Sequence, residues 1–299
     1  MAVLVKPKTT AEVRARTSAR KAILAHQSGR GVSLAILLIG VALFLLPLYV
    51  TLAMALKDQS EGATTSMWAW PTHPTLANFR EVLTNPNVSF ALFLKNTTLI
   101  AIVSTTGIVM TSAMAAYGFA RVEFAGRDRL FLVLLATMML PSIITMIPTY
   151  VMYARIGWVN TIKPLVVPAF FGGGAFNIFL LRQFYLGIPR ELDEAAFLDG
   201  ANHWTVFWKV LLPLTRPALV TVGVLSFMGA WRDFMGPLLY LNEPDKQTLE
   251  VGLRTYAALR AEKWHLLMAG SLLVMIPIII IFFIGQRSFV KGIVMTGGK

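Results

Sequence analysis

Few side chains along this chain could carry metal-dependent or acid–base chemistry. The four histidines stand far apart, without the spacing of a metal site. Cysteine is absent, which excludes disulfide bridges, thiolate zinc sites and a cysteine nucleophile. No segment matches the phosphate-binding pattern G-x-x-x-x-G-K-[ST]. We therefore expect no metal, no cofactor, no ATP site of the usual kind and no enzymatic activity in this chain.

The densest group of acidic side chains lies within residues 187–213. Glu191, Asp193 and Glu194 follow a proline closely, a pattern typical of a helix start, where acids favour the positive end of the helix dipole. Gly200 is a natural helix stop. The predicted helix is too short to span a membrane, so it either docks into a groove of another protein or rests on the membrane surface. Its apolar positions are Leu192, Ala195, Ala196 and Leu198.

Composition indicates which elements must position these residues. Of 299 residues, 56% are hydrophobic and 14% are charged, whereas about a quarter of the residues in a soluble domain are charged. Apolar surface on this scale cannot be hidden in one core, so lipid must solvate part of the chain. We predict an all-α membrane protein with six transmembrane helices. Six apolar stretches are long enough to cross a hydrocarbon core of about 30 Å: 32–56, 96–120, 130–154, 164–186, 214–241 and 266–286.

The basic residues are distributed unequally between the two sides of the predicted bundle. When alternate connections are assigned to the side of the N-terminus, that side carries 17 of the 27 lysines and arginines and a net charge of about +10, against about +2 on the other side. The positive-inside rule predicts cytoplasmic N- and C-termini and a cytoplasmic loop 187–213.

The basic N-terminal segment 1–31 is expected to lie against anionic lipid headgroups. Nucleic-acid binding would need basic residues interleaved with aromatic ones, and this segment contains no aromatic residue. No nucleic-acid partner is therefore expected.

Helix-breaking and small residues interrupt the predicted spans. Pro141 and Pro148 fall within the third stretch, and Pro168 with the glycines at 172–174 falls within the fourth. In lipid, breaks are tolerated where protein or a water-filled cavity satisfies the backbone hydrogen bonds, and transport proteins place such breaks near substrate paths.

Small residues spaced four positions apart in the second stretch favour close helix packing, with a substrate-facing groove as the alternative. They are Gly107, Thr111 and Ala115, and Ser112, Ala116 and Ala120.

Arg232 and Asp233 interrupt the apolar stretch that starts near Pro217. Neighbours in sequence do not face each other on a helix, so the two need not form a salt bridge. Two interpretations stay open. Either the pair is a functional polar group at the outer mouth of a pore, or the helix ends near Trp231 and the pair is interfacial.

The loop 187–213 resembles the signature loop, or EAA motif, of ABC importer permeases. The matching residues are Glu194-Ala195-Ala196, three residues, Gly200, nine residues, and then Val210-x-Leu212-Pro213. From about residue 32 onward the chain is similar to the carbohydrate-uptake branch, the binding-protein-dependent, maltose-permease-like importers. Segments that carry this likeness include Ala116-Tyr117-Gly118-Phe119-Ala120-Arg121, Asn96-Thr97 as the opening of the second helix, Gly236-Pro237-Leu238-Leu239-Tyr240-Leu241 and Gln286-Arg287-x-Phe289-Val290-x-Gly292.

The resemblance implies a type I ABC importer permease fold and a role for each region. Residues 32–291 would form the transmembrane permease domain, between the segment 1–31 and a cytoplasmic tail 292–299. Trp231, Arg232, Asp233 and Phe234 are expected along the substrate path, although the family usually has Trp-Asn-x-Phe there. The residues expected to couple transport to ATP hydrolysis are Glu191, Glu194, Ala195, Ala196, Asp199, Gly200, Leu212 and Pro213.

The same resemblance implies several partners in a bacterial or archaeal plasma membrane. A dimer of cytoplasmic ATP-binding subunits would bind ATP and Mg and accept the loop 187–213 in a cleft. A second homologous permease would complete the pore, and an extracytoplasmic sugar-binding protein would deliver solute, with residues 242–265 as a candidate docking loop. The function implied is ATP-driven import of a mono- or oligosaccharide or related polyol. The alternatives are an ABC permease for an amino acid, peptide or ion, and an ion-coupled secondary transporter.

Overall fold

A computed structural model describes residues 10–85, 89–259 and 263–296, and every regular element in these ranges is a helix. Four helical segments are long and apolar enough to cross a membrane. Two further pairs of helices, each bent at a short break, would bring the number of candidate spans to six if each pair is one span. This confirms the predicted all-α membrane fold. The four candidate spans that are long and apolar enough singly are Ser33–Leu56, Phe90–Arg121, Lys163–Leu186 and Trp264–Gln286.

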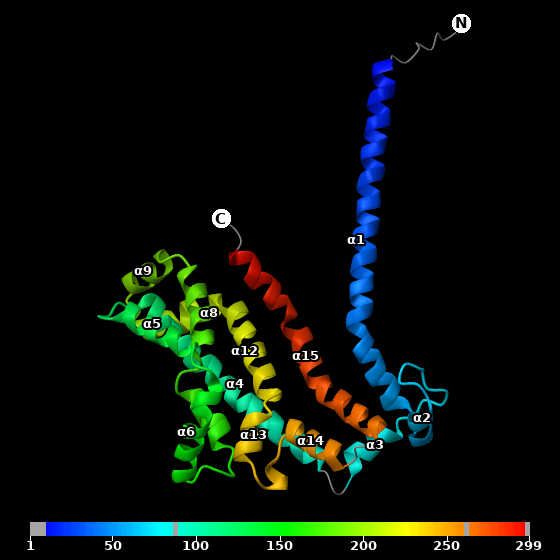
Figure 1. Cartoon of the computed structure of the whole chain (residues 1–299). Coiled ribbons are helices and arrows are strands. Elements are labelled where there is room, and N and C mark those ends of the chain that lie inside the picture. The colour runs from blue at the N-terminus through cyan, green and yellow to red at the C-terminus, as the bar shows by residue number, and fades with distance from the viewer. Residues whose placement is uncertain (1–9, 86–88, 260–262, 297–299) are drawn as a thin grey trace.

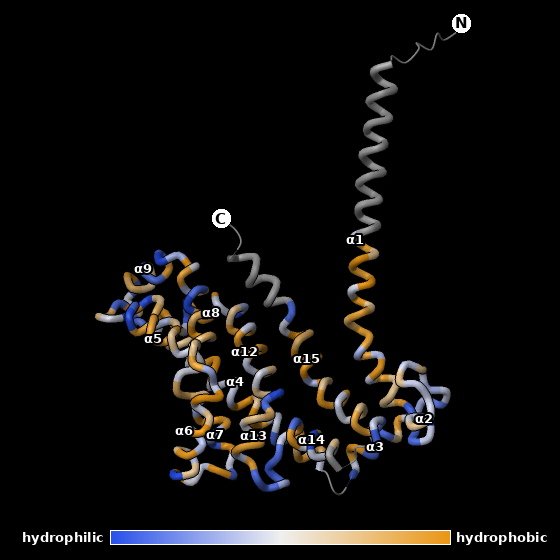
Figure 2. The backbone as a smooth tube through the Cα atoms, in the orientation of Figure 1, coloured by the Kyte–Doolittle hydropathy of each residue, from blue (hydrophilic) through white to orange (hydrophobic). Residues whose placement is uncertain are grey.

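The long helix α4 (Phe90–Arg121) is the centre of the bundle. It packs against α8 (Ala175–Leu186) and α12 (Arg216–Trp231), and α12 packs in turn against α15 (Trp264–Thr296). Figure 1 shows that α1 (Thr10–Leu56) stands apart from this bundle over most of its length. The C-terminal end of α1 approaches α15. Figure 2 shows hydrophobic residues along the described part of α1, as expected for a surface solvated by lipid.

The start of the second span differs from the sequence prediction, whereas the first candidate span, Ser33–Leu56, agrees with the predicted stretch 32–56. The second span starts at Phe90 rather than at Asn96, because residues 90–95 continue the helix after Ser89. The Asn96 side chain donates instead to the carbonyls of Asp245 and Gln247, at 2.9 and 3.0 Å, and so attaches an outer loop to α4. The basic segment is continuous with the first span, since α1 starts at Thr10.

Breaks occur in the two spans where the sequence predicted them and in a third span where it did not. Helices α5 (Arg127–Thr137) and α6 (Ser142–Arg155) meet at 94°, with Pro141 at the cap of α6, whereas Pro148 lies inside α6 without breaking it. In the next span, α7 (Lys163–Val166) and the short 3-10 helix η1 (Val167–Phe170) lead to three glycines with positive φ before α8. The third break bends the chain by 79° at Thr215, before α12.

Small residues allow α4 to approach the broken span closely. Ser112 and Ala116 on α4 are fully buried. A Cβ on Gly107 would lie 2.8 Å from the Phe170 ring, and one on Gly173 would overlap the Ser112 hydroxyl and lie 2.7 Å from the Ile108 carbonyl. These contacts confirm the close-packing interpretation of the small-residue rows.

The connections gather at two opposite ends of the bundle. Figure 1 shows α9 (Glu191–Leu198) at the same end as the start of α1 and the end of α15. The elements at the opposite end are α2 (Gln59–Thr64), α3 (Ala77–Thr84), α13 (Met235–Tyr240), η3 (Pro244–Lys246) and α14 (Leu249–Leu259).

Replacing Gly173 tests the packing of α4. We expect Gly173→Ala to lower the melting temperature of the assembled protein, because left-handed backbone costs a residue with a Cβ about 1–2 kcal/mol and the new methyl overlaps α4. Gly118→Ala on α4 is the control, since its Cβ meets nothing within 4 Å. Equal melting temperatures for the two variants would contradict this packing.

Candidate functional site

The helix α9 forms and stops as the sequence predicts. The backbone amides of Asp193 and Glu194 donate to the Arg190 carbonyl at 2.9 and 3.0 Å, which starts the first turn. At the other end, Gly200 has φ +83°, its amide donates to Phe197, and the next amide donates to Ala196 at 2.9 Å. This pair of bonds caps the helix through a glycine in left-handed conformation.

The outward face of α9 is apolar and uncovered. Leu198 is 90% exposed and Leu192 is 44% exposed, while the acidic side chains Glu191 and Glu194 are exposed beside them. Asp193 alone among the three acids of the first turn is buried. The helix therefore exposes leucines and buries a carboxylate, the reverse of what a free solvated loop helix would do.

A buried ion pair attaches α9 to the end of α4. The Asp193 Oδ2 atom lies 3.1 Å from the Nε atom of Arg121, and the two side chains are 9% and 3% exposed. The guanidinium also donates to the Ile188 carbonyl at 2.7 Å. The sequence pattern marked Asp193 as one of the acids that start the helix, but it did not predict the pairing with Arg121.

A second contact joins α4 to the segment after α9. The Tyr117 hydroxyl lies 2.9 Å from Nδ1 of His203, and its ring packs against Phe207, with centroids 5.3 Å apart. Phe207 is buried in this cluster, within the π-helical turn η2 (Val206–Leu211) that links α10 (His203–Thr205) to α11 (Leu212–Leu214). Trp204, three residues earlier in the chain, is exposed.

The other residues expected to couple transport occupy the edges of this unit. Ala196 and Leu212 pack against the buried cluster around Tyr117, while Ala195 and Asp199 are exposed. Pro213 is exposed, just before the bend at Thr215.

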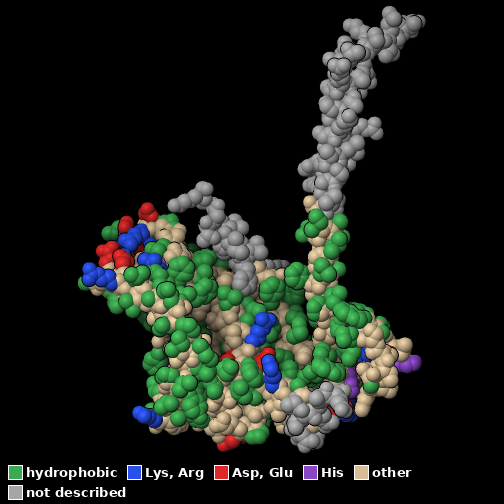
Figure 3. All heavy atoms as spheres, viewed as in Figure 1, with side chains coloured by type: hydrophobic (Ala, Val, Ile, Leu, Met, Phe, Trp, Pro, Cys, Tyr) green, Lys and Arg blue, Asp and Glu red, His purple; other side chains and the backbone are tan. Residues whose placement is uncertain are grey.

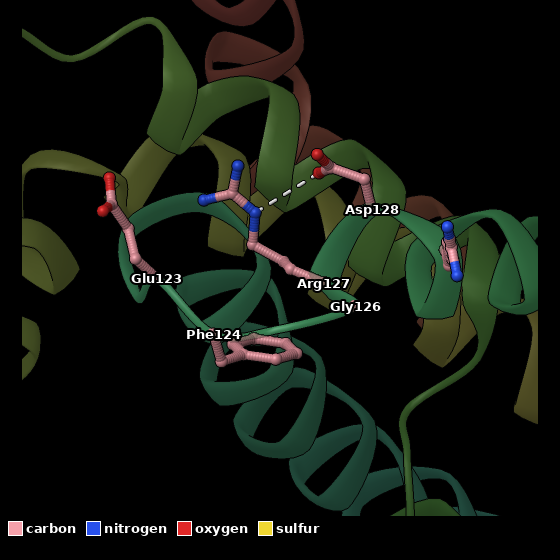
Figure 4. A pocket seen from close by; sticks show the side chains of 6 residues that line it. Glu123, Phe124, Gly126, Arg127 and Asp128 are labelled. Carbon is pink, nitrogen blue, oxygen red and sulfur yellow. Dashed lines mark hydrogen bonds and ion pairs between the residues drawn. The ribbon is translucent and has the colours of Figure 1, made fainter.

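A charged hollow of about 410 Å³ lies next to α9, where α4 turns into α5. Figure 4 shows Glu123, Phe124 and Arg127 around it, with Arg127 paired to Asp128 at 3.3 Å. Glu123 also lies 3.5 Å from Arg190 in an exposed ion pair. Figure 3 shows acidic and basic side chains gathered at this end of the molecule.

The four residues expected on the substrate path have different surroundings. Trp231 ends α12 and is buried, with its indole donating to the Val274 carbonyl at 3.1 Å. Asp233 accepts from the Gly236 amide, in the first turn of α13, at 3.0 Å and forms no ion pair with Arg232. Arg232 is exposed, and the Phe234 ring lies 4.9 Å from the Arg254 guanidinium. The helix thus ends at Trp231, as one of the two interpretations expected.

A cavity of about 610 Å³ lies between α4, the broken span and α12. The Asn177 amide donates to the Gly173 carbonyl at 2.8 Å, and the buried Ser226 hydroxyl has no hydrogen-bond partner in the described part of the chain. Glycines and alanines supply much of the remaining wall, so the lining is small and partly polar. Its polar side chains are Ser104, Asn177, Ser226 and Asp233.

No group of three or more histidine, aspartate or glutamate residues in the described ranges could hold a metal ion. Asp233 is the carboxylate in the cavity lining, and its side chain already accepts hydrogen bonds from the backbone amides of Met235 and Gly236. The arrangement offers space and hydrogen-bonding groups rather than an acid–base pair.

Comparisons with known proteins point to one family. The family model described as "Binding-protein-dependent transport system inner membrane component" matches residues 105–294. The chain is 34% identical over 229 residues to the arabinooligosaccharides transport system permease protein AraQ of Halalkalibacterium halodurans, covering 77% of this chain and 81% of the relative. It is 32% identical to the trehalose/maltose transport system permease protein MalG of Thermococcus litoralis, covering 73% and 79%.

A further relative and a solved structure agree with this result. The sn-glycerol-3-phosphate transport system permease protein UgpE of Pectobacterium atrosepticum is 31% identical, covering 86% of this chain and 93% of the relative. The fold is similar to that of a bacterial ABC transporter involved in the import of the acidic polysaccharide alginate, with a TM-score of 0.74 at 21% identity, covering 94% of this chain and 99% of the other.

Single cysteines can test the two ends of the bundle, because the chain has none. The basic excess predicts that Asp199→Cys, after α9, reacts with a membrane-impermeant thiol reagent only from the cytoplasmic side. Asp245→Cys, in η3 at the opposite end, should react only from outside. Labelling of position 199 but not 245 in intact cells would contradict the orientation.

Proposed function

The chain belongs to the family of binding-protein-dependent transport system inner membrane components, and we propose that it forms one half of the pore of an ATP-driven sugar importer. Separate cytoplasmic subunits bind ATP and Mg, and a second permease of similar fold completes the pore. An extracytoplasmic binding protein delivers the solute to the outer end, where α13 and α14 lie.

The uncovered face of α9 is the observation that carries this proposal. Leu192 and Leu198 lie on a helix at the predicted cytoplasmic end, and burying apolar surface stabilises by about 25 cal/mol per Å². The acids Glu191, Glu194 and Asp199 surround these leucines, and anionic headgroups would repel them. A protein groove with apolar walls and a basic rim suits this face better than the membrane surface, so we assign it to the ATPase subunit.

The cavity beside α4 is proposed as this chain's part of the solute path. Its lining combines apolar side chains with the amide of Asn177 and the hydroxyls of Ser104 and Ser226. Such a surface is suited to solutes rich in hydroxyl groups, which form hydrogen bonds with amide and hydroxyl side chains. The names of two relatives cite arabinooligosaccharides and trehalose or maltose. A neutral sugar is accordingly the proposed solute.

A phosphorylated polyol is the second candidate. A relative of comparable similarity is named for sn-glycerol 3-phosphate. Arg232 is exposed, lies near Glu250 and has no ion pair within 4 Å among the described residues. Arginine is suited to phosphate recognition. Competition assays on the cognate binding protein, with maltose, an arabinooligosaccharide and glycerol 3-phosphate as probes, distinguish the two candidates.

The stop of α9 provides a test of coupling. Gly200→Leu forces a branched residue into left-handed backbone, which costs about 1–2 kcal/mol. We expect import by the assembled transporter to fall roughly five- to thirtyfold, the rate equivalent of that energy, while the complex still assembles. Gly200→Asn is the matched control, because asparagine tolerates this conformation.

Charge reversal on the exposed face, Glu194→Lys, should also lower import without lowering protein yield, because the side chain is exposed and forms no ion pair within 4 Å among the described residues. Wild-type import by both Gly200→Leu and Glu194→Lys would show that α9 does not couple transport.

Filling the cavity provides a separate test of the solute path. Gly229 lines the cavity, and a Cβ on it meets nothing within 4 Å, so Gly229→Leu adds a side chain at the cavity wall. We expect at least a tenfold loss of import with normal assembly and ATP hydrolysis. Val220→Leu is the control, since it lies nine residues away and about half a turn out of phase on α12. Normal import by Gly229→Leu would remove the cavity from the solute path.

A further inference from the structure

The ion pair between Arg121 and Asp193 stands out as the buried polar contact between α9 and a spanning helix. Arg121 is the last residue of α4, and Asp193 lies in the first turn of α9. Both side chains are almost fully removed from solvent. The exposed pair of Arg190 and Glu123 holds the same region from outside, where ion pairs contribute about 0–1 kcal/mol.

The buried pair is poorly explained by stability alone. Burial raises the pKa of Asp193, and the positive charge of Arg121 only partly offsets this effect. The Asp193 Oδ1 atom has no hydrogen-bond partner among the described residues. Replacing a buried ion pair by apolar residues of similar volume is often neutral or stabilising by about 1–4 kcal/mol. An apolar contact would hold α9 as well, but it has no preferred direction.

Two contacts of Arg121 hold α9 in place relative to α4. Its Nη2 atom donates to the carbonyl of Ile188, in the connection just before α9. Its Nε atom lies 3.1 Å from Asp193 in an ion pair that does not have hydrogen-bond geometry. Both partners must move together with the end of α4. Without this contact, α9 could slide or rotate on its small buried face around Ala196.

The other end of this connection is the cavity. Helix α4 is unbroken from Phe90 to Arg121, and Ser104 and Ile108 on it line the cavity. Arg121 lies about 26 Å from Ser104 along the helix axis, at 1.5 Å per residue. A rigid helix thus extends from the ion pair to the cavity wall.

We propose that Arg121 is a positioning residue, which through Asp193 transmits displacement of α9 to α4 and so to the wall of the cavity. This inference rests on the proposed coupling function of α9. The residue touches neither ATP nor solute. Its role is to make α9 and α4 move as one body.

Accessibility of the cavity measures this transmission without knowledge of the solute. A single cysteine at Leu225, which lines the cavity and is 41% exposed, is introduced into the full transporter with its ATPase subunits. The rate of modification by an impermeant methanethiosulfonate reagent is compared with and without ATP and vanadate. We expect ATP to change this rate at least fivefold when the ion pair is intact.

Four backgrounds separate transmission from folding. Arg121→Gln and Asp193→Asn each leave one buried charge without its partner, and both should abolish the ATP-dependent change. The apolar double variant Arg121→Met with Asp193→Leu should keep the melting temperature and ATP hydrolysis of the unmodified transporter. It should nevertheless lose at least four-fifths of the ATP-dependent change in modification rate. The control Glu123→Gln, which breaks only the exposed ion pair, should keep the change.

Different failures have different meanings. A normal ATP-dependent change in the apolar double variant would overturn the inference, because packing alone would then transmit the motion. The inference would also fail if that change fell only in proportion to melting temperature across all backgrounds. If Gly200→Leu and Glu194→Lys uncouple import while the apolar double variant does not, the proposed function stands and only the role of Arg121 is lost.

Discussion

The structure depends on the close approach of α4 to the interrupted fourth span. Gly107 and Gly173 carry no side chain where the two segments meet, and any Cβ there would overlap Phe170 or Ser112. In a membrane, helices associate through packing rather than through a hydrophobic driving force, so contacts of this kind set the geometry. Because α8 and α12 both pack on α4, the position of this one helix fixes the rest of the bundle.

The same helix connects the two regions proposed to act in transport. Its middle forms one wall of the cavity, and its end meets α9 through Arg121. The breaks in the neighbouring spans leave room for the cavity, while α4 itself has no break. Irregular backbone beside a cavity and a continuous helix across from it suit a pore that must change shape without losing its fold.

Local rules were sufficient for much of this architecture. Acids after a proline and a glycine at the stop predicted α9, and Pro141 predicted the bend between α5 and α6. Tertiary contacts decided the rest. Asp193 and Glu191 are both acids in the first turn of the same helix. Asp193 is buried because Arg121, far away in sequence, lies beside it, whereas Glu191 remains in solvent. Arg121 did offer one signal, as the charge that ends an otherwise small and apolar helix face.

The central claim is that α9 is covered by an ATP-hydrolysing partner, and photocrosslinking measures this most directly. A benzophenone attached to Leu198→Cys, at the most exposed large apolar side chain of α9, is activated in native membranes. Mass spectrometry then identifies the attached chain. The account predicts a crosslink to a subunit that carries an ATP-binding sequence and its loss in Gly200→Leu. Attachment to lipid alone, with no protein product, would contradict it.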